Sequence, residues 1–441
     1  MEQPSQRQPR RVARRIWWRP IAVLAAAGTL VAACGSTSSS SSAVRASGSS
    51  NVLSGAPKAT AAEQSAILKQ IYWGGPVPPG LSKYVVNGMD RLAATKWTSA
   101  KEALAEHCFT AGSCTVGSGK DTLGILSAVP PDGWVDMVEM STILEALTYP
   151  QIGKIIIDTN NADISTTTSQ IHAMISQGVT GIVSFDVFGT AAKATYQAAT
   201  SAGIPVVLYQ DIMGPSGKGV VASQVAVSYC QLGQALAQGA AKALGSKGGN
   251  VALYTGVAGN AQAYGFGGTS PLERGWLSCA KQWFAQHQPN IHAVDTSLTD
   301  WTEGGNVSAT SALISSGKKV NAILYDDATF TTVISTYQNA HLPVPALIGW
   351  GQENDDVQAW IGANKSFPMD FSSYYGAVDA PVAVSVLMDK IGGQSVPNEV
   401  NFPVVEYPVA ANLYNSAIAP HTRVPTIPGM PSAVVNWVFR H

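Results

Sequence analysis

The sequence is poor in positive charge once its first 33 residues are set aside. Those residues contain six arginines and one glutamate, so the remaining chain has 21 Lys and Arg against 27 Asp and Glu, a net charge of −6. Nucleic-acid-binding proteins normally carry a basic patch, so this balance argues against a nucleic-acid partner. Long apolar runs are also missing. The 13 residues at 21–33 fall short of the roughly 20 that a membrane span needs, and no other run is longer.

The chain also lacks the common motifs of metal sites and hydrolases. Its seven histidines are scattered and no C-x-x-C occurs, which disfavours zinc. There is no G-x-S-x-G nucleophile motif. The GFGG at 265–268 lacks the strand-turn-helix setting of a dinucleotide loop, so a surface insert is favoured. We therefore expect no cofactor, no resident metal and no catalysis.

The first 42 residues have the organisation of an export signal. The arginine-rich RRVARRIWWRP precedes the apolar run at 21–33, and the stretch V-A-A-C ends at Cys34. This resembles the bacterial lipobox, which implies that Cys34 is acylated and anchors the protein to the outer face of the cell membrane. Residues 34–62, rich in Ser, Ala and Gly, then predict a disordered tether. A plain signal with an incidental cysteine and twin-arginine export remain alternatives.

Four further cysteines predict two disulfides in an exported chain. Cys108 and Cys114 are close enough in sequence to close a small loop. Cys230 and Cys279 then remain, and they would link two predicted helices.

From residue 121 onward, apolar strands alternate with amphipathic helices. This alternation predicts βαβ units and parallel sheets covered on both faces. The alternation of strands and helices begins again after about residue 212, which indicates two α/β halves. Residues 63–120 precede it as an N-terminal extension with helical stretches. The predicted strands are 122–129, 154–159, 181–186 and 204–210 in the first half, and 250–256, 322–327 and 346–350 in the second.

Several stretches resemble the periplasmic sugar-binding proteins of the ribose-binding type, in the order that this family has. They include GVTGIVSFD, AGIPVVLYQD, DWTEGGNVSATSALISSG and NAILYDDATFTTVISTYQNA. The likeness covers roughly residues 121–410. The lactose-repressor family shares this core but begins with a DNA-binding helix-turn-helix, where this chain has its signal. The resemblance therefore favours a binding protein.

The resemblance implies the α/β type I periplasmic binding protein fold, with two Rossmann-like lobes, parallel sheets flanked by helices and a three-strand hinge. The crossings are expected after VVLYQD, near FPMDFSS and near PNEVNFP. The expected organisation is a signal peptide at 1–33, the lipidated tether at 34–62, an N-terminal extension at 63–120, lobe 1 at 121–211 plus 371–397, lobe 2 at 212–370 plus 398–411, and a C-terminal extension at 412–441.

The ends of the predicted strands carry the side chains that polyol recognition needs, namely aromatic faces and planar hydrogen-bonding groups. The candidate ligand contacts are Trp134, Asn160, Asp186, Gln210, Asp211, Asn260, Trp301, Asp326, Gln352 and Asp370. Some have alternative roles. Trp134 would also suit a core or lid position, Asn160 a turn and Asp186 an N-cap. Glu353 is an alternative to Gln352, and Ser372 is an alternative to Asp370.

This chain departs from the family pattern in its candidate pocket. Gln210 and Asp211 stand where the family has Asp-Arg. Arg274 is two positions away from the family's binding arginine, so we expect it to be structural. The family's Gly-Phe-Asp appears as GWG at 349–351. Few cations remain near the expected site, so an anionic ligand is disfavoured. A neutral polyol or a cationic, amine-bearing ligand fits better.

The leading hypothesis is a monomeric, lipid-anchored binding protein that captures a small polar solute, a sugar or polyol, by hinge closure. It would deliver the solute to the permease subunits of an ABC importer. A ligand-sensing receptor for a membrane signalling protein has the same sequence features. An exported carbohydrate-active enzyme would need a catalytic pair across the cleft, and the sequence shows none with specific spacing.

Overall fold

The structure is a computed structural model that describes most of residues 59–441. The description leaves out 72–76, 78–80, 128–132, 160–162, 211, 257–270, 328, 374–377, 423, 425–428 and 440–441. Cys34, Asn160, Asp211, Asn260 and the GFGG stretch therefore lie outside the described residues. Within the described part of the chain, no helix is both long and apolar enough to cross a membrane.

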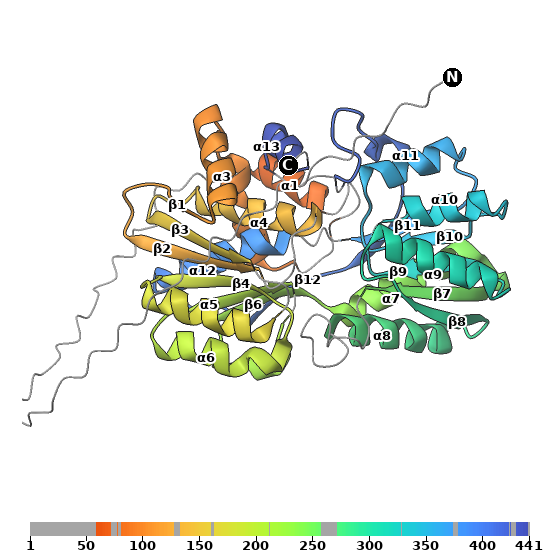
Figure 1. Ribbon diagram of the computed structural model, residues 1–441, viewed down its shortest axis with the longest axis horizontal. Helices are drawn as coiled ribbons and strands as arrows, with labels where there is room; N and C mark the ends of the chain where they lie inside the picture. The colour runs from red at the N-terminus through yellow and green to blue at the C-terminus, as the bar shows by residue number, and fades with distance from the viewer. Residues whose placement is uncertain are drawn as a thin grey trace, which may run out of the picture. The chain divides into compact units, whose positions relative to one another are not determined.

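The first sheet has seven strands in the order β1-β3-β2-β4-β5-β6-β12, all parallel except β1. Helices α5 and α6 lie on one face, and α4 and α12 lie on the other (Figure 1). The strands are β1 (Ser113–Thr115), β2 (Asp121–Ser127), β3 (Ile152–Thr159), β4 (Gly181–Asp186), β5 (Val206–Gln210), β6 (Ser223–Val227) and β12 (Glu399–Phe402). The helices are α4 (Gly133–Ala146), α5 (Ile164–Ser176), α6 (Lys193–Ser201) and α12 (Asp379–Ile391).

The second sheet has six strands in the order β13-β11-β10-β9-β7-β8, and only β13 is antiparallel. Its strands are β7 (Gly249–Thr255), β8 (Ile291–Leu298), β9 (Ala322–Tyr325), β10 (Ala346–Gly349), β11 (Met369–Ser373) and β13 (Val405–Pro408). Its helices are α7 (Tyr229–Leu244), α8 (Pro271–His287), α9 (Glu303–Ser315), α10 (Thr331–Asn339) and α11 (Asn354–Gly362). Every residue of β9 and β10 is buried, as expected for parallel strands covered on both faces. The expected α/β fold with two helix-flanked parallel sheets is confirmed.

The chain passes between the sheets three times, after β6, after β11 and between β12 and β13. The first passage comes later than the expected point after residue 211. Residues 223–227 pair with β5, and residues 399–402 pair with β6, so both segments lie in the first sheet and not in the second. The strand β6 was missed because it carries two polar residues. Both are buried, and Gln224 bonds Met213 N and Gly214 O. We call the two sheets with their helices the first and second lobes.

The N-terminal extension forms α1 (Ala61–Ile71), α2 (Lys83–Ala94), α3 (Ser99–Ala111) and β1. Helix α2, which the sequence did not reveal, packs on α12 and α4 of the first lobe. Its Arg91 guanidinium lies 4.1 Å from the centre of the Tyr149 ring. The extension is therefore built onto the first lobe. The C-terminal extension contains η5 (Ala411–Leu413) and α13 (Ser432–Val438).

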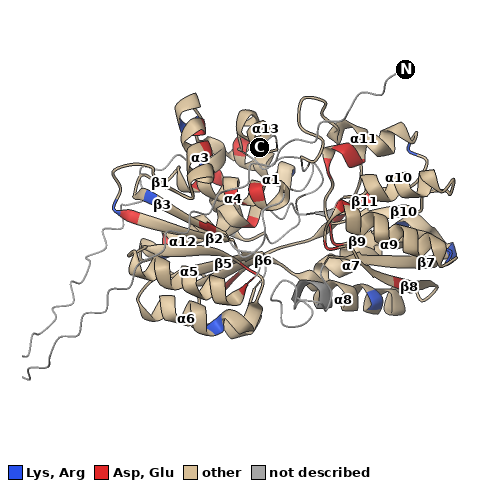
Figure 2. Ribbon diagram, in the orientation of Figure 1, with Lys and Arg blue, Asp and Glu red and all other residues tan. Residues whose placement is uncertain are grey.

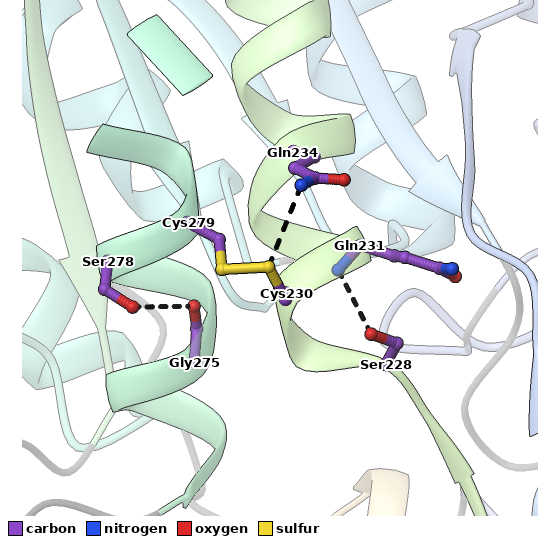
Figure 3. The surroundings of a disulfide bond; sticks show 7 residues. All are labelled: Ser228, Cys230, Gln231, Gln234, Gly275, Ser278 and Cys279. Atoms are coloured by element: carbon purple, nitrogen blue, oxygen red, sulfur yellow. Dashed lines mark hydrogen bonds between the residues drawn. A yellow bond between two sulfur atoms is a disulfide. The ribbon is translucent and has the colours of Figure 1, made fainter. Parts of the chain in front are cut away.

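Both predicted disulfides are confirmed. Cys108–Cys114 fastens α3 to the edge strand β1. Cys230–Cys279 links α7 to α8, and Figure 3 shows it between the two helices, near the Ser228 side chain that caps α7. The second bridge fixes two helices of the same lobe across 49 residues of chain.

Candidate functional site

At the carboxyl end of β4, Asp186 is fully buried, and both oxygens of its carboxylate have hydrogen-bond partners within the protein. Its carboxylate accepts hydrogen bonds from Phe188 N at 3.1 Å, Gly189 N at 3.0 Å and Tyr196 Oη at 3.2 Å. Two of these donors are backbone amides of the turn that follows the strand. Bonds of this kind, from amides two and three residues on, are those of a local turn closed by an aspartate side chain. The N-cap of the helical turn that follows is Phe188, so Asp186 does not take the N-cap role that the sequence left open.

Gln210 is the last residue of the neighbouring strand β5, and both its backbone conformation and its side-chain hydrogen bonding are unusual. Its backbone φ is +68°, and its carbonyl accepts a 2.6 Å hydrogen bond from Tyr229 Oη. The side chain is 4% exposed, and its Oε1 has no hydrogen-bond partner among the described residues. A buried amide oxygen without a partner costs free energy, so this group is poised to accept a hydrogen bond. The end of β2 supplies a similar group, because Ser127 Oγ is buried and also lacks a described partner.

Trp134, near the start of α4, is half-buried. Its ring meets Phe185 edge to face at 5.5 Å, and Phe185 in turn stacks on Tyr209 at 5.6 Å. The two inner rings are buried, so Trp134 is the partly accessible end of an aromatic row behind the strand ends. Aromatic pairs of this kind hold one another in fixed orientations.

In the second lobe, Asp326 directly follows β9 and is a hydrogen-bond hub. Its Oδ2 accepts from Thr255 Oγ1 at 2.8 Å and from Trp276 Nε1 at 2.9 Å, and its Oδ1 accepts from Trp301 Nε1 at 3.1 Å. Burial raises the pKa of Asp326 to about 7, although the three hydrogen bonds favour the charged form. The carboxylate is thus committed to holding two indoles in place.

Trp301 is half-buried, and its backbone has a φ of +50°. Its indole lies so close to Gly256 that a β-carbon there would collide with the ring. Glycine is therefore required beneath this indole. Asp326 and Gly256 together fix Trp301 in a position that resembles that of Trp134 in the first lobe, beside the carboxyl ends of the strands.

Gln352, three residues beyond β10, is fully buried. Neither its amide nitrogen nor its amide oxygen has a hydrogen-bond partner among the described residues. It is the second-lobe counterpart of Gln210. Its neighbour Glu353 is used differently, as the first residue of a capping box at the start of α11.

The structure does not bring Asp370 to this group. Asp370 is the second residue of β11, and its carboxylate forms a 3.2 Å ion pair with Lys242 of α7. Burial raises the pKa of Asp370, and Lys242 partly offsets the effect.

Figure 2 shows red acidic segments on α3, α4 and α11 and only scattered blue ones, in keeping with the excess of acidic residues.

Comparisons with known proteins agree with the two-sheet α/β fold. A family model described as a periplasmic binding protein domain matches residues 127–394. No curated protein matches the chain. Many solved structures share the fold. One is a solute-binding protein of an ABC transporter from Mycobacterium smegmatis with bound glycerol, 17% identical, with a TM-score of 0.58 over 68% of this chain and 98% of that one. Another is from Bacillus halodurans with bound myo-inositol, 18% identical, with a TM-score of 0.55 over 66% and 95%.

Proposed function

Because the chain belongs to the periplasmic binding protein family, we propose that it is an exported solute-binding protein for a small neutral polar solute, a sugar or polyol. The observation that carries this proposal is the pair Gln210 and Gln352. Gln210 ends a strand of the first sheet, and Gln352 lies three residues beyond a strand of the second. Both are buried, and both have amide atoms without a described partner. A hydroxyl-rich ligand both donates and accepts, so it would complete both amides.

The two partly accessible indoles support the same class of ligand. Trp134 and Trp301 lie beside the strand ends of the first and second sheets, and an indole face suits the apolar face of a sugar ring. Solved structures of the same fold hold glycerol and myo-inositol, which are uncharged polyols. The three passages of the chain between the lobes would act as the hinge, and contacts from both lobes would favour the closed state.

The expected cellular setting completes the proposal. Acylated Cys34 would hold the protein on the outer face of the membrane, and closed, loaded protein would dock on the permease of an ABC importer. The anchor is tested by replacing Cys34 with alanine in the full chain. The variant should lose incorporation of labelled fatty acid and leave the membrane fraction. Retention of the label would contradict this assignment.

Binding is tested by calorimetry on the mature chain with a panel of glycerol, myo-inositol, aldoses, amino acids and amines. The matched pair of variants is Gln352→Met and Gln338→Met, because Gln338 is exposed on α10. Gln352→Met keeps the shape of the side chain but removes its polar atoms. It should weaken binding of the best panel ligand about tenfold or more without loss of apo stability. Gln338→Met should change neither. Equal affinities for both variants would refute the role of Gln352.

A further inference from the structure

The C-terminal extension is attached to the second lobe at the start of α11. Asn415 N donates to Asn354 Oδ1 at 2.8 Å, and Asn354 Nδ2 donates to Asn415 O at 2.9 Å. The backbone amides of Asn354 and Asp355 donate to the carbonyls of Thr422 and Pro420, each at 3.0 Å. The first amides of a helix have no partner within the helix, so the extension satisfies groups that would otherwise need water.

His421 adds an ionic latch to this attachment. Its Nδ1 lies 3.2 Å from Glu353 Oε2 and 3.4 Å from Asp355 Oδ2, and its Nε2 lies 4.0 Å from Glu303 Oε1. The fully buried Asp356 stands behind them in the same helix turn. The hydrogen bond to Glu353 and the neighbouring carboxylates raise the pKa of His421 to about 9, so the imidazole is charged at neutral pH. The cluster is therefore an ion pair between the extension and two helices of the second lobe.

The loop that carries Gln352 is held by the same attachment. Val424 N donates to Gln352 O at 3.2 Å, and both Thr422 and Val424 are buried. The extension thus covers the segment between β10 and α11, at the carboxyl end of the second sheet.

The other end of the extension lies on the first lobe. Helix α13 contacts α3 and α4, with the Trp437 ring 5.7 Å from Phe109 in an edge-to-face pair. Gly429, at a φ of +78°, lies so close to Ala93 of α2 that no β-carbon would fit between them. Val434, Val435 and Val438 are buried, so this end is an apolar anchor. Figure 1 shows α13 beside α3 and the preceding C-terminal loop beside α11.

We propose that the described parts of the C-terminal extension, residues 411–422, 424 and 429–439, attach it to both lobes as an interlobe strap. This fourth connection restricts how far the two lobes separate. The three hinge passages set the axis of motion, and the strap is fastened on both sides of it. A polar and ionic latch fastens one end, and an apolar helix fastens the other. The weaker, partly exposed latch is the end that should release first when the lobes separate, because the apolar anchor buries three valines.

The proposal is tested without a ligand, so its outcome is independent of the proposed function. Spin labels are placed on the mature Cys34→Ser chain at Lys193→Cys of α6 and Lys281→Cys of α8, both exposed. Pulsed electron–electron double resonance then gives the distribution of distances between the two labels, one on each lobe.

Release variants are made at each end of the strap, His421→Ala and Trp437→Ala, singly and together. His172→Ala, an exposed histidine on α5, is the matched control. We expect each release variant to broaden the distribution toward longer distances, the double variant most, and the control to match the parent. If the distance distribution of the double variant superimposes on that of the parent, the C-terminal extension does not restrict the separation of the lobes.

Discussion

Replacing Asp326 with asparagine tests whether this carboxylate organises the second-lobe half of the site. The wild-type group accepts three hydrogen bonds, two at Oδ2 and one at Oδ1. Asparagine keeps the shape but has only one acceptor oxygen. In either orientation of the amide, its NH₂ group faces at least one N–H or O–H donor.

The structure indicates which orientation is less costly. With NH₂ toward Trp301, one hydrogen bond at a half-buried indole is lost, at about 1 kcal/mol. With NH₂ toward Trp276, a fully buried indole N–H would be left unpaired, at about 1–3 kcal/mol, and the bond from Thr255 would also be disturbed. We therefore expect a loss of about 1–3 kcal/mol and a freed Trp301.

The sign of the pH dependence follows from the pKa of about 7. A carboxyl group whose pKa is higher in the folded state contributes stability that is fully present below its unfolded value of 3.8 and is lost as pH rises to about 7. Asparagine does not titrate. The stability difference between wild type and Asp326→Asn should therefore be larger at pH 5 than at pH 8.

The assay is urea unfolding at both pH values, followed by tryptophan fluorescence. Asp327→Asn is the matched control, because Asp327 is adjacent and accepts a bond from Thr329 Oγ1 instead of an indole. If Asp326→Asn and the wild type have equal free energies of unfolding at both pH values, the three hydrogen bonds of Asp326 do not organise this half of the site.

Three further predictions concern the framework. Removing a disulfide gives the unfolded chain more freedom, and the loss of stability grows with the length of the closed loop. The free energy of unfolding should fall by about 4 kcal/mol without Cys230–Cys279, which closes 49 residues, and by about 2 kcal/mol without Cys108–Cys114, which closes 6. Urea unfolding of the two double-alanine variants measures both losses. His421→Ala should lower the melting temperature at pH 6 but lose this effect as pH rises through about 9, because the pKa of His421 is raised by its carboxylate partners. Arg91→Met should destabilise the protein by about 1–3 kcal/mol, because Arg91 donates to Thr148 O and its guanidinium lies over the Tyr149 ring. Glu145→Gln should be tolerated, because burial raises the pKa of Glu145 to about 8 and the carboxyl group is mostly uncharged at pH 7; thermal unfolding of both variants tests these expectations.

Local signals predicted much of the fold. The apolar runs at 181–186 and 204–210 are strands β4 and β5 almost to the residue, because buried parallel strands are apolar on both faces. The disulfides were also predictable, since four cysteines with one close pair leave only one other pairing. These features depend on neighbouring residues or on simple counting.

Long-range partners could not be predicted. Asp370 is paired with Lys242, which lies 128 residues earlier, and Asp326 is bonded to Trp276, 50 residues earlier. In the sequence Trp276 reads as an ordinary apolar position of a helix. Strand β6 was missed for the same reason, because the burial of Gln224 depends on bonds to a separate loop.

The distribution of satisfied and unsatisfied groups also bears on the charge of the ligand. The sequence left open a cationic, amine-bearing ligand, because acidic residues end several strands. In the structure those carboxylates are occupied internally. Asp186 closes a turn, Asp326 holds two indoles and Asp370 pairs with Lys242. The groups described above at the strand ends that lack described partners are all neutral: the Ser127 hydroxyl and the amides of Gln210 and Gln352. A cation would find none of the three carboxylates uncommitted and would lose its hydration, whereas a neutral polyol would gain partners at both amides. Polyols should therefore bind more tightly than amines in the calorimetric panel, and preferential binding of an amine would refute this reasoning.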